Sequence, residues 1–283
     1  MLISPYTPLF FSHHKSDGID SRCCQVFAPT DRIMVEVIRT ADEAMAKAVL
    51  HNITKDTAHN ITWNSWQIND DTIIDFTEIS GLTDGFYYLT IGAEKSKYFQ
   101  ITSNAALLAN TTLIQYSNKD NRQRTDVAFF IGGQQYFFDF RVPGGFKDSG
   151  WTFGVENEQF VTDQSDIVEL YGVDSCSQMF TMGTNIGCPV WFAELLNRLL
   201  TCNYVYFDGL RYARKESSVP EITIQMEGLN SFVFNQLLQK VRNLNPRIEK
   251  VNQYIIRKVG DGYIGVDMGF DGDIYNYYQR SIK

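Results

Sequence analysis

The sequence predicts a mainly β protein, in which an N-terminal immunoglobulin-like β-sandwich is followed by a β-rich α+β domain with two helices. Three observations lead to this prediction. Aromatic residues make up 14% of the chain, and aromatic side chains favour strands. Short runs of alternating apolar and polar residues recur between turn signals. Two segments of the second half carry apolar residues at helical spacing.

The length of 283 residues suits about two domains. We expect an extended N-terminal arm over residues 1–24, the sandwich over residues 25–103 and the β-rich domain over residues 104–283. Residues 104–110 contain small residues and two asparagines, and we interpret them as a linker.

The predicted sandwich consists of strands about 8–15 residues apart, a spacing typical of immunoglobulin-like folds. Residues 40–48 are open to a second interpretation as a helical turn. The expected strands cover residues 33–38, 46–53, 62–68, 71–78, 86–91 and 97–102.

The second domain is predicted to contain both strands and helices. Asp208-Gly209 between two apolar runs is a strong hairpin signal. Pro189 can start a helix that continues to about residue 201, and we expect a second helix over residues 231–242. Strands are expected at residues 112–117, 126–131 and 135–142, the last stopped by Pro143-Gly144-Gly145, and again within residues 253–278.

Charge and hydropathy exclude several classes of partner. The chain has 25 basic and 33 acidic residues, and no basic stripe forms along it, so we expect no nucleic-acid binding and no anionic membrane binding. The apolar start of the chain has no basic lead-in and is broken by Pro5 and Pro8, unlike a signal peptide. We therefore expect a soluble protein made in the cytoplasm.

The sequence predicts no enzyme, no cofactor and no metal site. All four histidines precede residue 60, away from the larger domain, and no hydrolase, phosphate-loop or dinucleotide motif is present. The five cysteines are odd in number and form no C-x-x-C pair, which indicates reduced thiols. A pair of carboxylates for glycoside hydrolysis is the least favoured alternative, because sequence places no two across a cleft.

Aromatic residues offer candidate contact points. Trp63 and Trp66 lie three apart on one expected strand and so point to opposite faces, one toward the core and one toward solvent, a sugar or a partner. The glycine-rich residues 144–150 precede Trp151. We interpret them either as a β-turn packed by Trp151 or as a contact loop.

Five segments carry a resemblance to a known family. They read Pro-Leu-Phe-Phe-Ser-His-His-Lys-Ser-Asp-Gly at 8–18, Gln-Val-Phe-Ala-Pro-Thr-Asp-Arg at 25–32, Thr-Leu-Ile-Gln-Tyr-Ser-Asn at 112–118, Gly-Phe-Lys-Asp-Ser-Gly-Trp at 145–151 and Arg-Lys-Glu-Ser-Ser-Val-Pro at 214–220. With these segments the chain resembles structural proteins from the tail modules of phages and prophages of Bacteroidales-type gut bacteria.

The resemblance implies a tail or baseplate protein, analogous to the distal tail protein that forms a ring. Its partners would be copies of itself and other tail proteins, and it would reside in the virion after synthesis in the host cytoplasm. A carbohydrate- or receptor-binding module for a host surface glycan is the alternative. The residues we expect at an interface are Leu9, Phe10, Phe11, Trp66, Phe146 and Trp151.

Overall fold

The computed structural model shows a mainly β protein, as predicted. It describes residues 1–11, 23–185, 187–215, 221–226, 231–241, 254–259, 262–268 and 274–277. Residues 1–240 form one compact unit and residues 241–283 a second. In the second unit, β20 (Tyr254–Val259), β21 (Gly262–Met268) and β22 (Ile274–Tyr277) form an antiparallel sheet.

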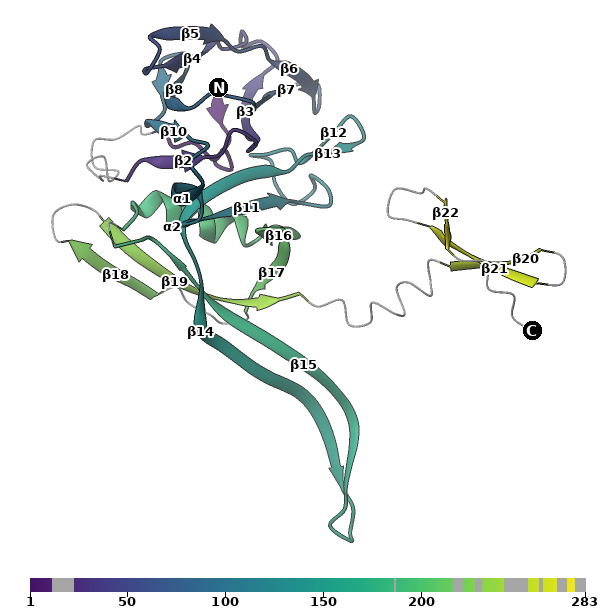
Figure 1. The fold of residues 1–283 in the computed structure, drawn as a ribbon. Coiled ribbons are helices and arrows are strands. Elements are labelled where there is room, and N and C mark those ends of the chain that lie inside the picture. Colours follow the sequence, from purple (N-terminus) through teal and green to yellow (C-terminus); the bar gives the residue numbers. More distant parts are fainter. Residues whose placement is uncertain are drawn as a thin grey trace. The chain divides into compact units, whose positions relative to one another are not determined.

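Two facing sheets make up the N-terminal part of the first unit (Figure 1). One has the order β1-β3-β7-β6 and the other the order β2-β10-β8-β4-β5, with β9 paired to β8. Their strands are β1 (Leu2–Ile3), β2 (Gln25–Phe27), β3 (Ile33–Thr40), β4 (Ala48–Asn52), β5 (Thr57–Asn60), β6 (Asn64–Gln67), β7 (Thr72–Ile79), β8 (Gly85–Ile91), β9 (Glu94–Lys95) and β10 (Phe99–Ile101).

Strand β3 is buried on both faces, which explains its long apolar run. Val35 and Val37 point into the core between the two sheets, together with Leu50 and Leu89. Met34 belongs to a second and larger core that extends into the rest of the unit. The sheet of β3 therefore lies between two apolar cores.

Six further strands of the first unit form a closed barrel. The sheet order is β15-β14-β11-β16-β17-β19-β18, and β15 also pairs with β19, so six strands form a ring and β18 flanks it. The strands are β11 (Thr111–Ser117), β14 (Phe138–Val161), β15 (Ile167–Met182), β16 (Tyr204–Phe207), β17 (Leu210–Arg214), β18 (Glu221–Met226) and β19 (Ser231–Lys240); a separate short hairpin joins β12 (Phe130–Ile131) to β13 (Gln134–Gln135).

Two helices lie within the described residues. Helix α2 (Val190–Leu199) confirms the first predicted helix, with Pro189 in the N-cap position, and it buries Phe192, Leu195 and Leu199 in the large core. The short α1 (Ala105–Leu108) lies within the predicted linker and is capped by the Asn104 side chain. Neither of these two helices of the described residues is long and apolar enough to cross a bilayer.

The predicted helix at residues 231–242 is wrong, because Ser231–Lys240 forms strand β19. Phe234, Gln236 and Leu238 are buried at every second position, which is the period of a strand. Phe234, Leu237 and Leu238 also fit the i, i+3, i+4 spacing of one helix face, so the local sequence pattern is compatible with both a helix and a strand. Pairing with β15 and β17 decides the outcome.

The predicted stop at Pro143-Gly144-Gly145 is also wrong, since β14 continues through these residues to Val161. Gly144 has a φ of +113°, which a glycine adopts without cost, and it pairs with Met182. Residues 147–150 form a bulge opposite Met179, where a β-turn or contact loop was expected.

The N-terminal segment is packed onto its own chain. Leu2–Ile3 pairs with β3, and Tyr6 is completely buried in the large core. An extended arm over residues 1–24 is therefore wrong for residues 1–11, and residues 12–22 lie outside the described residues. The possible helical turn at residues 40–48 is absent, because these residues leave β3 through turns and enter β4.

Candidate functional site

The most exposed apolar feature among the described residues is the outer part of the β14–β15 hairpin, residues 151–176, which we call the distal hairpin (Figure 1). Strand β14 pairs with β11 only up to Pro143, and β15 pairs with β19 only from Ser177 onward. Between these limits the two strands pair with each other alone. An isolated two-stranded hairpin is marginally stable in water, so this segment needs further contacts.

The distal hairpin exposes large apolar side chains on both strands. Phe153 is 73% exposed, and its ring stacks on Trp151 at a centroid distance of 6.3 Å. Of the twenty exposed large apolar side chains among the described residues, nine lie here: Trp151, Phe153, Val155, Phe160, Val161, Ile167, Val168, Leu170 and Tyr171. Such a concentration marks an interaction surface.

The strand register assigns these side chains to faces. Trp151, Phe153 and Val155 alternate along β14 and share one face, because residues two apart point the same way. The register shifts next to Glu158, where Leu170 on β15 has no partner. A bulge at such a position interrupts the pairing and twists the hairpin locally.

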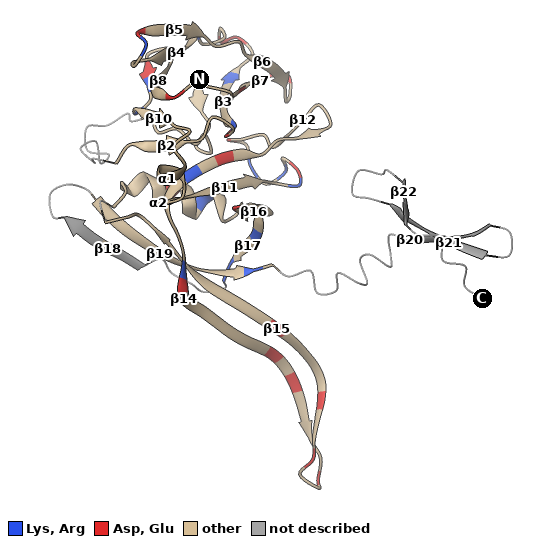
Figure 2. Ribbon diagram, viewed as in Figure 1, with Lys and Arg blue, Asp and Glu red and all other residues tan. Residues whose placement is uncertain are grey.

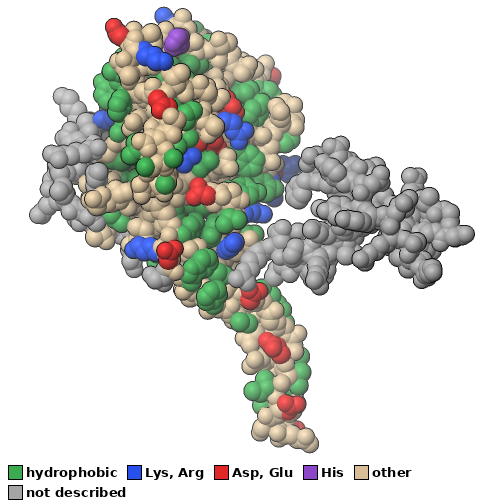
Figure 3. Space-filling view, in the orientation of Figure 1, with side chains coloured by type: hydrophobic (Ala, Val, Ile, Leu, Met, Phe, Trp, Pro, Cys, Tyr) green, Lys and Arg blue, Asp and Glu red, His purple; other side chains and the backbone are tan. Residues whose placement is uncertain are grey.

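Charge in the distal hairpin has a single sign. Its 26 residues include six carboxylates and no lysine, arginine or histidine, which accounts for most of the chain's net charge of −8. Figure 2 shows the acidic residues along the outer parts of β14 and β15. In Figure 3 hydrophobic and acidic side chains alternate over the same segment. A partner surface must therefore be apolar and neutral or basic.

Five of the six expected interface residues pack in or against the two cores or against helix α2. Leu9 and Phe11 are buried in the sandwich core, and Phe10 stacks on Trp191 at 5.0 Å. Trp66 and Phe146 pack against the large core. Trp151 is 43% exposed and lies in the distal hairpin. Which of these residues contact a partner stays a prediction.

Sequence reasoning missed the rest of the distal hairpin. A signal was available in residues 151–155, where Trp151, Phe153 and Val155 alternate with small residues. After the Thr-Asp-Gln-Ser-Asp turn at 162–166, in which the Thr162 backbone N–H donates to the Asp166 carbonyl at 2.9 Å, four of residues 167–171 are apolar. Two apolar runs around a polar turn predict a hairpin.

The two tryptophans of β6 and its preceding loop point to opposite faces, as predicted. Trp63 is buried in the sandwich core, where its indole N–H donates to the carbonyl of Ala46 at 2.8 Å. Trp66 packs against the large core. Trp66, expected to face solvent, a sugar or a partner, is thus half-buried against its own chain.

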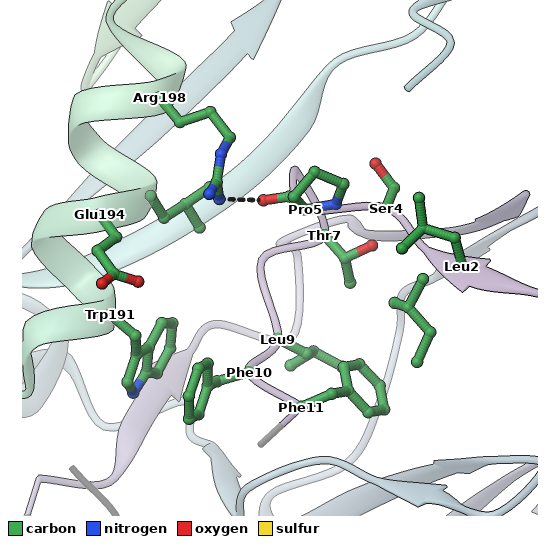
Figure 4. A pocket seen from close by; sticks show the side chains of 12 residues that line it. Leu2, Ser4, Pro5, Thr7, Leu9, Phe10, Phe11, Trp191, Glu194 and Arg198 are labelled. Carbon is green, nitrogen blue, oxygen red and sulfur yellow. Dashed lines mark hydrogen bonds between the residues drawn. The ribbon is translucent and has the colours of Figure 1, made fainter. Parts of the chain in front are cut away.

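A pocket of about 290 Å³ lies between the N-terminal segment and α2 (Figure 4). Its charged side chains are Glu194 and Arg198, and Arg198 donates to the carbonyl of Pro5 at 2.7 Å. The lining contains neither a histidine nor a cysteine.

Three of the cysteine thiols, those of Cys23, Cys188 and Cys202, have a raised pKa that disfavours ionisation at neutral pH. Burial raises the pKa of the Cys23 and Cys202 thiols to about 12 and raises that of Cys188 further. A thiol must ionise to act as a nucleophile. In the part of the chain that the structure describes, no group of three or more histidine, cysteine, aspartate or glutamate side chains could hold a metal ion.

Buried charges join the sandwich to the barrel. Arg141 of β14 donates to both carboxylate oxygens of Asp31, at 2.7 and 2.8 Å. Asp139 accepts from the Arg32 backbone N–H at 2.9 Å and from Gln115 at 2.9 Å. Each oxygen of these two carboxylates accepts at least one hydrogen bond, so both carboxylates hold the sandwich and barrel segments together.

Glu36, on the face of β3 toward the large core, gives a prediction on pH. Burial raises the pKa of its carboxyl to about 8, while one oxygen accepts from the Ala128 backbone N–H at 3.0 Å. The folded state thus holds a proton that the unfolded chain releases above a pKa of ~4.3. We expect the free energy of unfolding to fall by up to ~1.4 kcal/mol per pH unit as pH rises from ~5 to ~8. The Glu36→Gln variant should lose this component, as measured by urea unfolding at several pH values; equal slopes in both proteins would contradict it.

Comparisons with protein-family models and with curated proteins find no match for this chain.

Proposed function

We propose that this chain is a structural component of a phage tail or baseplate, with an immunoglobulin-like sandwich, and that it assembles through the distal hairpin. The proposal rests on the exposure of nine large apolar side chains on a hairpin whose outer part pairs with no third strand among the described residues. Covering that surface removes apolar area from water, at about 25 cal/mol per Å². The sequence resemblance supports the choice of a tail over other assemblies.

Protein contacts suit this surface better than a small ligand. The hairpin is convex and open on both edges, whereas small-molecule sites are concave. Its two free strand edges can also accept a further strand from a partner. The proposed role requires no catalysis.

The first test compares the solution mass of the full chain with that of a shortened chain, by light scattering after gel filtration. In the shortened chain, Asn-Gly replaces residues 154–175 and joins the paired Phe153 and Cys176 through a two-residue turn. We expect discrete oligomers from the full chain and monomers from the shortened chain, with similar thermal unfolding. Identical masses would contradict the role of the hairpin.

A pair of single substitutions tests whether assembly depends on the hairpin itself or on exposed apolar side chains in general. Phe153→Ser removes a 73% exposed ring from the hairpin, and Phe86→Ser removes a 44% exposed ring from the sandwich. The first should weaken assembly and the second should not. Detection of the protein by mass spectrometry in purified virions tests its place in a tail.

A further inference from the structure

The barrel presents an apolar surface that carries a basic residue, on the outer side of β16 and β17. Val205, Phe207 and Tyr212 point into the large core, so the residues between them point outward. We call this outward set the basic aromatic face: Phe137, Tyr204, Tyr206 and Arg211. Tyr206 contacts Phe137 with ring centroids 6.0 Å apart and pairs with Arg211 across the two strands.

Arg211 is held in place on this face without neutralisation. Its guanidinium lies 5.1 Å from the ring centroid of Tyr204 and donates to the Asn203 carbonyl at 2.8 Å. None of the ion pairs among the described residues involves Arg211. An exposed arginine fixed over an aromatic ring is a frequent centre of binding energy at protein interfaces. The basic colour on β17 in Figure 2 marks this region.

The basic aromatic face and the distal hairpin are complementary. The hairpin offers Trp151, Phe153 and Val155 on one face, with carboxylates around them and no basic residue. The barrel face offers aromatic side chains around Arg211, a cation in none of the ion pairs among the described residues. Opposite charges around an apolar centre favour encounter and fix register. Two distal hairpins would repel each other, because both carry only negative charge.

We propose that the distal hairpin of one copy docks on the basic aromatic face of a second copy. This inference rests on the proposed function and names the partner of the same hairpin. The hairpin surface is not covered within its own copy, since Phe153 is 73% exposed. Contact between two different surfaces of one chain is head-to-tail, so copies add in one direction and form a ring or a filament.

The test reverses the charge of Arg211 and compares the result with a matched control. Arg211→Glu places a carboxylate opposite the acidic hairpin, whereas Lys47→Glu makes the same charge change on an exposed residue before β4. We expect Arg211→Glu to raise the dissociation constant of the oligomer by at least about tenfold, which equals ~1.4 kcal/mol. The control should leave it unchanged. Sedimentation velocity over a concentration series measures both.

A photo-crosslinking residue at position 153 locates the contact. This chain is mixed with an isotope-labelled chain, irradiated and digested, and we expect crosslinks between copies to fall on residues 204–211. Crosslinks elsewhere, or equal effects of Arg211→Glu and Lys47→Glu, would overturn the assigned face. If the shortened chain nevertheless fails to assemble, the proposed function stands and only this partner is lost. A full chain that stays monomeric at every concentration overturns both.

Discussion

Gly144→Ala is expected to destabilise the protein by at least ~4 kcal/mol. A Cβ at this position would lie 2.2 Å from the Thr181 carbonyl oxygen and 3.2 Å from the Met182 Cα. Both are backbone atoms of the paired strand β15, so they move only if the barrel is distorted. The φ of +113° adds strain for any residue with a side chain.

The control for this prediction is Gly132→Ala in the turn between β12 and β13. Gly132 also has a positive φ, of +59°, but a Cβ there meets nothing within 4 Å. Its cost should be only ~1–2 kcal/mol, from the left-handed backbone alone. Urea unfolding of both variants separates collision from backbone strain. Equal losses would show that Thr181 moves away without cost.

Arg141→Ala is expected to reduce the free energy of unfolding by ~3–5 kcal/mol. The side chains of Arg141 and Asp31 are only 12% and 2% exposed, so the variant leaves Asp31 as a buried carboxylate without its cation. Asp31 keeps one bond, from the Ala28 backbone N–H at 2.7 Å. That bond cannot replace the charge of the guanidinium.

Arg124→Ala supplies the matched comparison. Arg124 pairs with Asp126 at 2.6 Å, but these side chains are 35% and 25% exposed. A pair screened by water contributes at most ~1 kcal/mol. Chemical denaturation should therefore distinguish the two arginines clearly. A loss for Arg141→Ala no larger than that for Arg124→Ala would refute a structural role for the buried pair.

The sequence allowed most sandwich strands to be predicted, because each buries one face against a nearby neighbour. Leu89 and Ile91 on β8, for example, alternate with Thr90, and the alternation is visible without any structure. Strand β5 (Thr57–Asn60) was missed, since all four of its residues are exposed and no apolar period marks it. A strand whose side chains are all exposed therefore leaves no apolar alternation in the sequence from which it could be predicted.

The errors in the barrel have a different origin. Residues 231–240 satisfy two periods, and their partners on β15 and β17 lie about 20 to 60 residues away in sequence. A Pro-Gly-Gly run usually ends a strand, but β14 continues through Gly144. There the backbone lies so close to Thr181 of β15 that only glycine fits. The distal hairpin was missed because sequence cannot show that its apolar residues lack a covering layer. That information resides in tertiary structure.

The closed barrel has a consequence for biosynthesis. Strand β11 starts at Thr111, but the ring closes only when Ser231–Lys240 has been made and can pair with β15 and β17. Non-local pairing of this kind slows folding. During translation the apolar residues of the β14–β15 hairpin leave the ribosome well before the strand that completes their support. We therefore expect a nascent chain that depends on chaperones until β19 emerges, and yields that improve when translation is slowed by lower temperature.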